Sequence, residues 1–96
     1  MSVFVFASLT FTNKDRYRAY QARFAEVFRQ SGGDLLVADE APLALEGEPP
    51  DKVVVMGFPD RETARRFLES PAYRAIAEDR KAGAAARAVL VRGLKD

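Results

Sequence analysis

Alternating or continuous runs of apolar residues along the chain predict four β-strands. These strands are residues 3–11, 34–40, 52–58 and 86–93. They are rich in β-branched and aromatic residues, which favour pleated structure, and KVVVMGF at 52–58 has the strongest pattern. PLALEG at 42–47 predicts a further short strand or an extension of a sheet edge. EPPD at 48–51 then predicts a break, because neither proline can donate a hydrogen bond to a neighbouring strand.

Apolar residues at steps of three and four predict helices between these strands. The first helix falls within residues 12–33, and its apolar stripe consists of Tyr17, Tyr20, Phe24, Val27 and Phe28. Thr12 or Asn13 is expected to cap its first turn, and Gly32 and Gly33 are expected to end it.

The second helical pattern, at 59–69, has Asp60 as its expected cap and is expected to bury Ala64, Phe67 and Leu68. Ser70-Pro71 then interrupts the pattern. Serine at a cap followed by proline at the first helical position is the usual start of a helix, so a new helix is predicted over 71–80 with a different axis.

The order of these elements predicts an α+β fold. A strand, a helix, two or three strands, a helical segment and a last strand match the ferredoxin-like βαββαβ arrangement, an antiparallel sheet with helices on one face. The 96 residues suffice for one compact domain, so a single domain over 1–96 is expected.

The first strand predicts how the other face of this sheet is used. Its odd positions are all apolar, whereas its even positions are Phe4, Phe6, Ser8 and Thr10. A sheet face without helices must be solvated or covered, and the two phenylalanines favour cover by a second copy. We therefore expect a homodimer with Phe4 and Phe6 at its interface.

Composition removes several classes of function. The 15 basic and 14 acidic residues give a net charge of +1, which argues against nucleic acid as a partner. There is no cysteine and no histidine, so no tightly bound transition metal, haem or other cofactor is expected. No segment resembles a signal peptide or a membrane span, and a cytoplasmic protein without membrane or nucleic-acid partners is predicted.

Several stretches together resemble a known family. They are TNKDRYRAY, GGDLLV, LEGE, KVVVMGFPD, ETARRFLESPAYRAIAEDR and RAVLVRG, and the most specific combination is Phe58-Pro59, Ser70-Pro71-x-Tyr73 and Arg80. The chain resembles domain-of-unknown-function family 1330, within the dimeric α/β-barrel superfamily. The resemblance implies a homodimer whose two sheets face each other and enclose a barrel-like space. The superfamily also includes small monooxygenases and isomerases.

The chain departs from the pattern of that family at three places. Asn13-Lys14-Asp15 stands where Asp-Pro-Glu is usual, Lys52 stands where arginine is frequent, and Gly57 stands where glutamate is frequent. Without that glutamate, the chain has less support for a carboxylate base near the third strand.

Five residues are candidates for ligand binding. Tyr73 and Arg80 are seven residues apart and leave a helix on nearly the same face, where they either hold a ligand or serve packing and an internal ion pair. Lys52 opens a strand and is either a solvated strand end or an anion clamp. Ser8 and Thr10 either line the space between two sheets or lie at an edge.

Two hypotheses for function follow. The first is a homodimer that binds a small acidic or aromatic organic molecule between sheet and helices, with arginine as the partner of a carboxylate. The alternative is a cofactor-independent enzyme, monooxygenase- or isomerase-like, that uses tyrosine, lysine and arginine for acid–base work. The sequence leaves open whether the protein is an enzyme.

Overall fold

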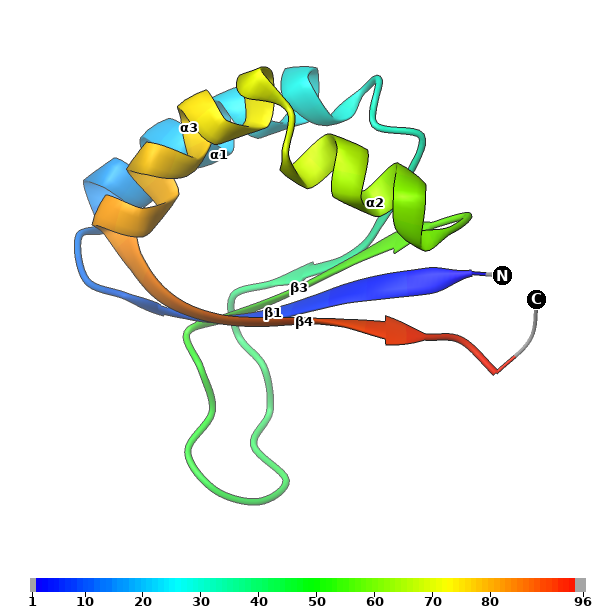
Figure 1. The fold of residues 1–96 in the computed structure, drawn as a ribbon. Helices are drawn as coiled ribbons and strands as arrows, with labels where there is room; N and C mark the ends of the chain where they lie inside the picture. Colours follow the sequence, from blue (N-terminus) through cyan, green and yellow to red (C-terminus); the bar gives the residue numbers. More distant parts are fainter. Residues whose placement is uncertain (1, 95–96) are drawn as a thin grey trace.

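The computed structural model describes residues 2–94 as a four-stranded sheet with helices on one face (Figure 1). The strands are β1 (Val3–Phe11), β2 (Asp34–Asp39), β3 (Lys52–Phe58) and β4 (Ala84–Arg92). The helices are α1 (Lys14–Phe28), α2 (Arg61–Leu68) and α3 (Pro71–Gly83). The strands lie in the order β2-β3-β1-β4, and every neighbouring pair is antiparallel. The predicted ferredoxin-like βαββαβ fold is thereby confirmed.

The core lies between the sheet and the helices. β1 is central, and its Val5 pairs with Met56 on β3 and with Leu90 on β4. Residues directly opposite each other share a face, so these side chains all turn toward the helices. The buried apolar residues of this layer are Val3, Val5, Leu9, Tyr17, Tyr20, Phe28, Met56, Phe58, Ala64, Phe67, Tyr73, Ile76, Ala77 and Ala84.

Side-chain caps fix where the helices begin. Asn13 Oδ1 accepts a hydrogen bond from Arg16 N at 3.2 Å, and Asp60 Oδ1 accepts one from Thr63 N at 2.7 Å. Ser70 Oγ caps α3 by accepting from the backbone N–H of its third residue at 3.2 Å. These caps confirm the predicted starts, including the Ser-Pro restart between α2 and α3.

One predicted strand is absent, and several elements begin or end at other residues than predicted, including α3, which runs to Gly83 rather than to residue 80. Residues 42–47 form no strand, and their leucines, Leu43 and Leu45, are almost fully exposed. β2 stops at Asp39 because its Oδ1 accepts from Ala41 N at 2.8 Å, a local turn that competes with strand pairing. The helix predicted within 12–33 ends at Phe28. β4 begins at Ala84 rather than at residue 86.

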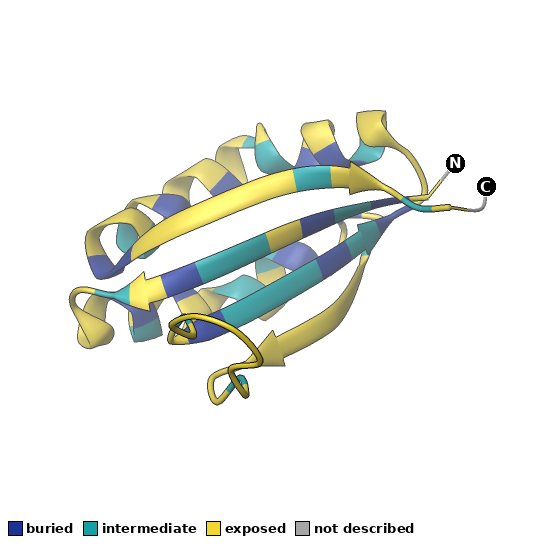
Figure 2. Cartoon of the chain, turned by 90° about the horizontal axis from the view of Figure 1, so that it is seen from below, coloured by how far each residue is buried: buried dark blue, intermediate teal, exposed yellow. Residues whose placement is uncertain are grey.

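The face of the sheet away from the helices is open, and we call it the open face (Figure 2). Phe6, Val55 and Val89 are opposite one another in the register and lie on this face. The Phe6 side chain is 43% exposed. The segment 40–51, here called the β2–β3 loop, projects from the same side of the sheet (Figure 1).

Among residues 2–94, no helix combines the length and the apolar character that crossing a bilayer requires. The cytoplasmic location stays a prediction.

Candidate functional site

A cavity of about 280 Å³ lies between the sheet and helices α1 and α3, and we call it the central cavity. It is lined by Val5, Ala7, Leu9, Tyr17, Tyr20, Val54, Met56, Leu68, Tyr73, Arg80, Ala86 and Ala88. Three of these positions, on β1 and β4, are alanines. Their short side chains leave unfilled the space that larger side chains would occupy in a close-packed core.

Three tyrosines and one arginine are the polar residues that line the central cavity. The hydroxyls of Tyr20, on α1, and Tyr73, on α3, lie 3.1 Å apart and share a hydrogen bond. Burial, assisted by Tyr73, raises the pKa of Tyr20, so its hydroxyl stays protonated at neutral pH. Arg80 Nε is buried and has no hydrogen-bond partner among residues 2–94. A buried donor without an acceptor is unfavourable, and this one lies at the wall of an apolar cavity.

The Ser-Pro restart positions two of these groups. Tyr73 lies in the first turn of α3, and Arg80 lies two turns later on the same side, so both line the central cavity. The residues that the sequence paired by helical spacing are therefore brought together. Their role in ligand binding stays a prediction.

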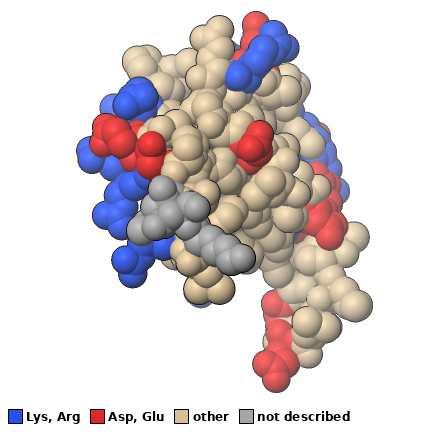
Figure 3. Space-filling view, turned by 90° about the vertical axis from the view of Figure 1, so that its right-hand side faces the viewer, with Lys and Arg blue, Asp and Glu red and all other residues tan. Residues whose placement is uncertain are grey.

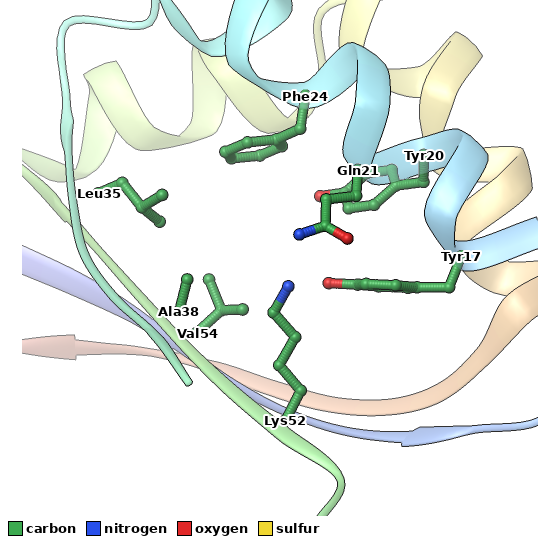
Figure 4. Close-up of a pocket in the computed structure, with 8 residues that line it drawn as sticks. All are labelled: Tyr17, Tyr20, Gln21, Phe24, Leu35, Ala38, Lys52 and Val54. Carbon is green, nitrogen blue, oxygen red and sulfur yellow. The ribbon is translucent and has the colours of Figure 1, made fainter. Parts of the chain in front are cut away.

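A second, smaller cavity of about 80 Å³ lies beside the first, and we call it the lysine chamber (Figure 4). Its lining residues are Tyr17, Tyr20, Gln21, Phe24, Leu35, Ala38, Lys52 and Val54. Tyr17, Tyr20 and Val54 line both cavities and thus stand between them. Lys52 rises from β3 toward α1, and its Nζ faces the Tyr17 hydroxyl and the Gln21 amide (Figure 4).

Lys52 is only 3% exposed, so its interpretation as a solvated strand end was wrong. The physical reason is strand parity: Lys52 pairs with Leu9, whose side chain faces the helices. Its Nζ lies 4.9 Å from the centre of the Tyr17 ring and 3.5 Å from Glu40 Oε2.

Glu40 interacts more strongly with Arg18 than with Lys52. Both carboxylate oxygens of Glu40 accept from the Arg18 guanidinium, with 2.6 Å between Nη2 and Oε1. The hydrogen bond from Arg18 is the main reason why the pKa of Glu40 falls to about 2, and Lys52 contributes less. The three side chains together carry one uncompensated positive charge.

The remaining candidates lie on the other side of the sheet. Ser8 and Thr10 pair with Arg87 and Ala85, and they share the open face with Phe6. The structure therefore separates them from Tyr73, Arg80 and Lys52. Phe4 lines a shallow hollow on the same side of the sheet, next to Gly57. The proposed interface roles of Phe4 and Phe6 remain predictions.

Sequence reasoning did not consider Gln21, which lines the lysine chamber, or the ion pair between Arg18 and Glu40 beside Lys52. It placed Tyr20 on the apolar stripe of the first helix and did not name it among the candidates for ligand binding. The helical stripe already placed Tyr20 on the buried face of α1. No sequence signal placed Glu40 beside Arg18, because that pair joins a loop to a helix through tertiary structure. Within residues 2–94 there is no cluster of three acidic side chains suited to a metal ion.

The fold and the cavities define a class of protein: a ferredoxin-like α+β domain with an internal cavity beneath its helices. A family model described as a domain of unknown function, DUF1330, matches residues 2–94. The chain therefore belongs to this family. Among curated proteins, no sequence matches it significantly.

Solved structures share the fold at low sequence identity. A protein of unknown function from Rhodopseudomonas palustris has a TM-score of 0.82 and 20% identity, over 99% of this chain and 84% of that one. SnoaB, a cofactor-independent oxygenase from Streptomyces nogalater, has a TM-score of 0.72 and 18% identity, over 99% and 95% of the two chains. A dimeric ferredoxin-like protein of unknown function from Thermobifida fusca has a TM-score of 0.72 and 17% identity, over 97% and 92%.

Proposed function

We propose that the protein binds a small aromatic acid in the central cavity. The observation that carries this proposal is Arg80 Nε, a buried donor with no partner among residues 2–94, at the wall of a cavity of about 280 Å³. An acceptor on a ligand would remove the cost of this unsatisfied group. The guanidinium favours a planar carboxylate, because its N–H groups form a fork that matches two oxygens.

The rest of the cavity wall supports an aromatic body for this ligand. Most of the lining is apolar, and the aromatic rings of Tyr17, Tyr20 and Tyr73 supply flat surfaces. The hydroxyls of Tyr20 and Tyr73 already bond to each other, so one hydroxyl hydrogen remains for a second acceptor on the ligand.

Binding of benzoate by isothermal titration calorimetry tests this proposal, with benzamide as the uncharged analogue. Benzoate should bind, and Arg80→Met should weaken its binding by about tenfold or more. The matched control is Lys81→Met, which removes the next cation along α3 from an exposed position and should leave binding unchanged. Equal binding by the parent and Arg80→Met would refute the proposal.

The second candidate is a cofactor-independent oxygenase, and the similarity of fold to SnoaB favours it. Such an enzyme needs a proton acceptor or a substrate that ionises unaided. Tyr20 is a poor base because its pKa is raised, so in this protein the tyrosine pair would act as a donor. Oxygen consumption with a dihydroxyaromatic substrate tests this candidate. A rate equal to that without protein rules it out for that substrate.

The open face supports the proposal that the protein is a homodimer. Phe6, Val55 and Val89 form an apolar surface there, and burying a phenylalanine contributes about 1.5–3 kcal/mol. In such a dimer Ser8 and Thr10 would face the space between the two sheets.

The β2–β3 loop supports a second copy as the partner of this face. Figure 3 shows the loop standing away from the body with acidic side chains at its end, and its sequence includes Glu46 and Glu48. The open face carries the exposed Arg87, which pairs with Ser8 in the register. Opposite charges on the loop and the sheet of one chain suit contacts between two copies.

Light scattering after gel filtration tests the dimer. The parent should have the mass of two chains, and Phe6→Asp should have the mass of one, because a carboxylate cannot be buried there without a partner. Ala22→Asp, on the exposed side of α1, is the control and should remain dimeric. A parent with the mass of one chain at micromolar concentration would exclude the dimer.

A further inference from the structure

We infer that the lysine chamber is a second binding site, separate from Arg80, which takes a short-chain carboxylate of two or three carbons. The site is built on Lys52, with Gln21 at its mouth and Tyr17 at its wall. This inference does not depend on the proposal for the central cavity, because the two cavities use different cations.

The charge balance of the chamber supports an anionic ligand. Among residues 2–94, the one carboxylate within ion-pair distance of Lys52 is Glu40, 3.5 Å away, and Arg18 already holds both oxygens of that group. The cations Arg18 and Lys52 and the anion Glu40 together have a net charge of +1. The Lys52 side chain is almost completely buried. A buried charge without a full partner is costly, and an anion in the chamber would lower that cost.

The donors of the chamber support a carboxylate. Arg18 Nη1 donates to Gln21 Oε1 at 2.6 Å, which fixes the amide so that its NH₂ group turns toward Lys52 (Figure 4). The Lys52 ammonium has three N–H groups. Glu40 Oε2 lies 3.5 Å from the Lys52 Nζ, and the Tyr17 ring, whose centre is 4.9 Å away, attracts the cation electrostatically. The Lys52 ammonium and the Gln21 amide can thus converge on the two oxygens of one carboxylate.

The size and walls of the chamber limit the rest of the ligand. A volume of about 80 Å³ is smaller than the roughly 150 Å³ cavity that holds benzene in another protein, so a benzoate ring does not fit. Phe24, Leu35 and Val54 present apolar walls to a short hydrocarbon chain. Acetate and propionate match both the charge and the volume, and propionate is the probe of choice.

Titration of propionate into the ¹⁵N-labelled full chain, followed by NMR, tests the site. We expect saturable shifts around Lys52 and Gln21 with a dissociation constant in about the millimolar range, as suits a ligand of so few atoms. Propionamide has the same shape without the charge and should produce no saturable shifts. Sodium chloride at equal ionic strength controls for screening.

Two variants locate the carboxylate. Lys52→Met keeps the length of the side chain and should weaken propionate binding by about tenfold or more, whereas Arg80→Met should leave it unchanged. Gln21→Leu should weaken it less. If Lys52→Met does not fold, Gln21→Leu and the propionamide comparison still decide.

The inference is overturned if propionamide binds as well as propionate, or if Lys52→Met and Gln21→Leu both bind propionate as the parent does. It is also overturned if Arg80→Met abolishes propionate binding, because the carboxylate then sits in the central cavity. Benzoate binding that depends on Arg80 would persist in each of these cases, so failure of this site is distinguishable from failure of the proposed function.

Discussion

Replacing Arg80 with methionine should stabilise the unliganded protein. Arg80 Nε is buried without a partner among residues 2–94, and such a donor costs about 1–3 kcal/mol. Methionine has a similar length, keeps the apolar contacts of the arginine stem and carries no such donor. This substitution also removes a cation from the last turn of α3, which costs about 0.3–1 kcal/mol through the helix dipole. The net expectation is a gain of about 0–2.7 kcal/mol in the free energy of unfolding.

Urea denaturation followed by circular dichroism measures this difference, at one protein concentration and with unchanged m-values. Lys81→Met is the matched control, because it removes a neighbouring cation from the same helix turn without touching a buried donor. The free energy of unfolding of Lys81→Met should fall only by the contribution of the helix dipole. The melting temperature of Arg80→Met should rise by about 4–8 °C for each kcal/mol gained. If Arg80→Met is less stable than Lys81→Met by more than about 1 kcal/mol, then Arg80 serves the fold and the ligand argument fails.

Three further substitutions test the packing, the ion pair and the cap. Gly83→Ala should lower the free energy of unfolding, measured by urea denaturation, by about 1–3 kcal/mol, because the new Cβ would lie 2.4 Å from Tyr17 N on α1. Gly57→Ala is the control and should lower it much less, because the new Cβ would contact only side chains. The pKa of Glu40 is lowered from 4.5 to about 2, so its stabilisation is complete above about pH 4.5 and is lost as the pH falls toward 2. Glu40→Gln should remove that part of the acid dependence, less than about 1 kcal/mol between pH 6 and pH 3, and an unchanged profile would contradict the assignment. Ser70→Ala should lower the melting temperature through a cost of about 1 kcal/mol, and Ser70→Asp, another capping residue, should largely avoid it.

Local rules were sufficient for most of the fold. The β-branched run at 52–58 and the cap residues Asn13, Asp60 and Ser70 mark elements whose ends depend on short-range sterics and hydrogen bonds. The same rules failed at 42–47. The leucines there alternate as in a strand, but a strand also needs a neighbour with free backbone groups, and that information is not local.

The candidate site was predictable only in part. Helical spacing placed Tyr73 and Arg80 together, because a helix has a fixed period. Strand parity also placed Lys52 on the same side as Val54, but lysine is so often exposed that composition outweighed this signal. The contact of Lys52 with Glu40 depends on how the β2–β3 loop folds back. Alternation within one strand does not contain that information.

The pairing of the first strand with the last determines how this domain must assemble. β1 is central, and one of its edges is satisfied only by β4, with Val3 opposite Arg92 and Gly93 N donating to Ser2 O at 2.9 Å. During synthesis β1 leaves the ribosome before β4 and keeps an unpaired edge until β4 follows. Pairing two strands that lie so far apart in the sequence slows folding. Until β4 pairs with it, the free edge of β1 can pair with other chains. Expression at lower temperature or with chaperones should raise the yield of folded protein more than stabilising α1 would, since the delay lies in the order of strand arrival.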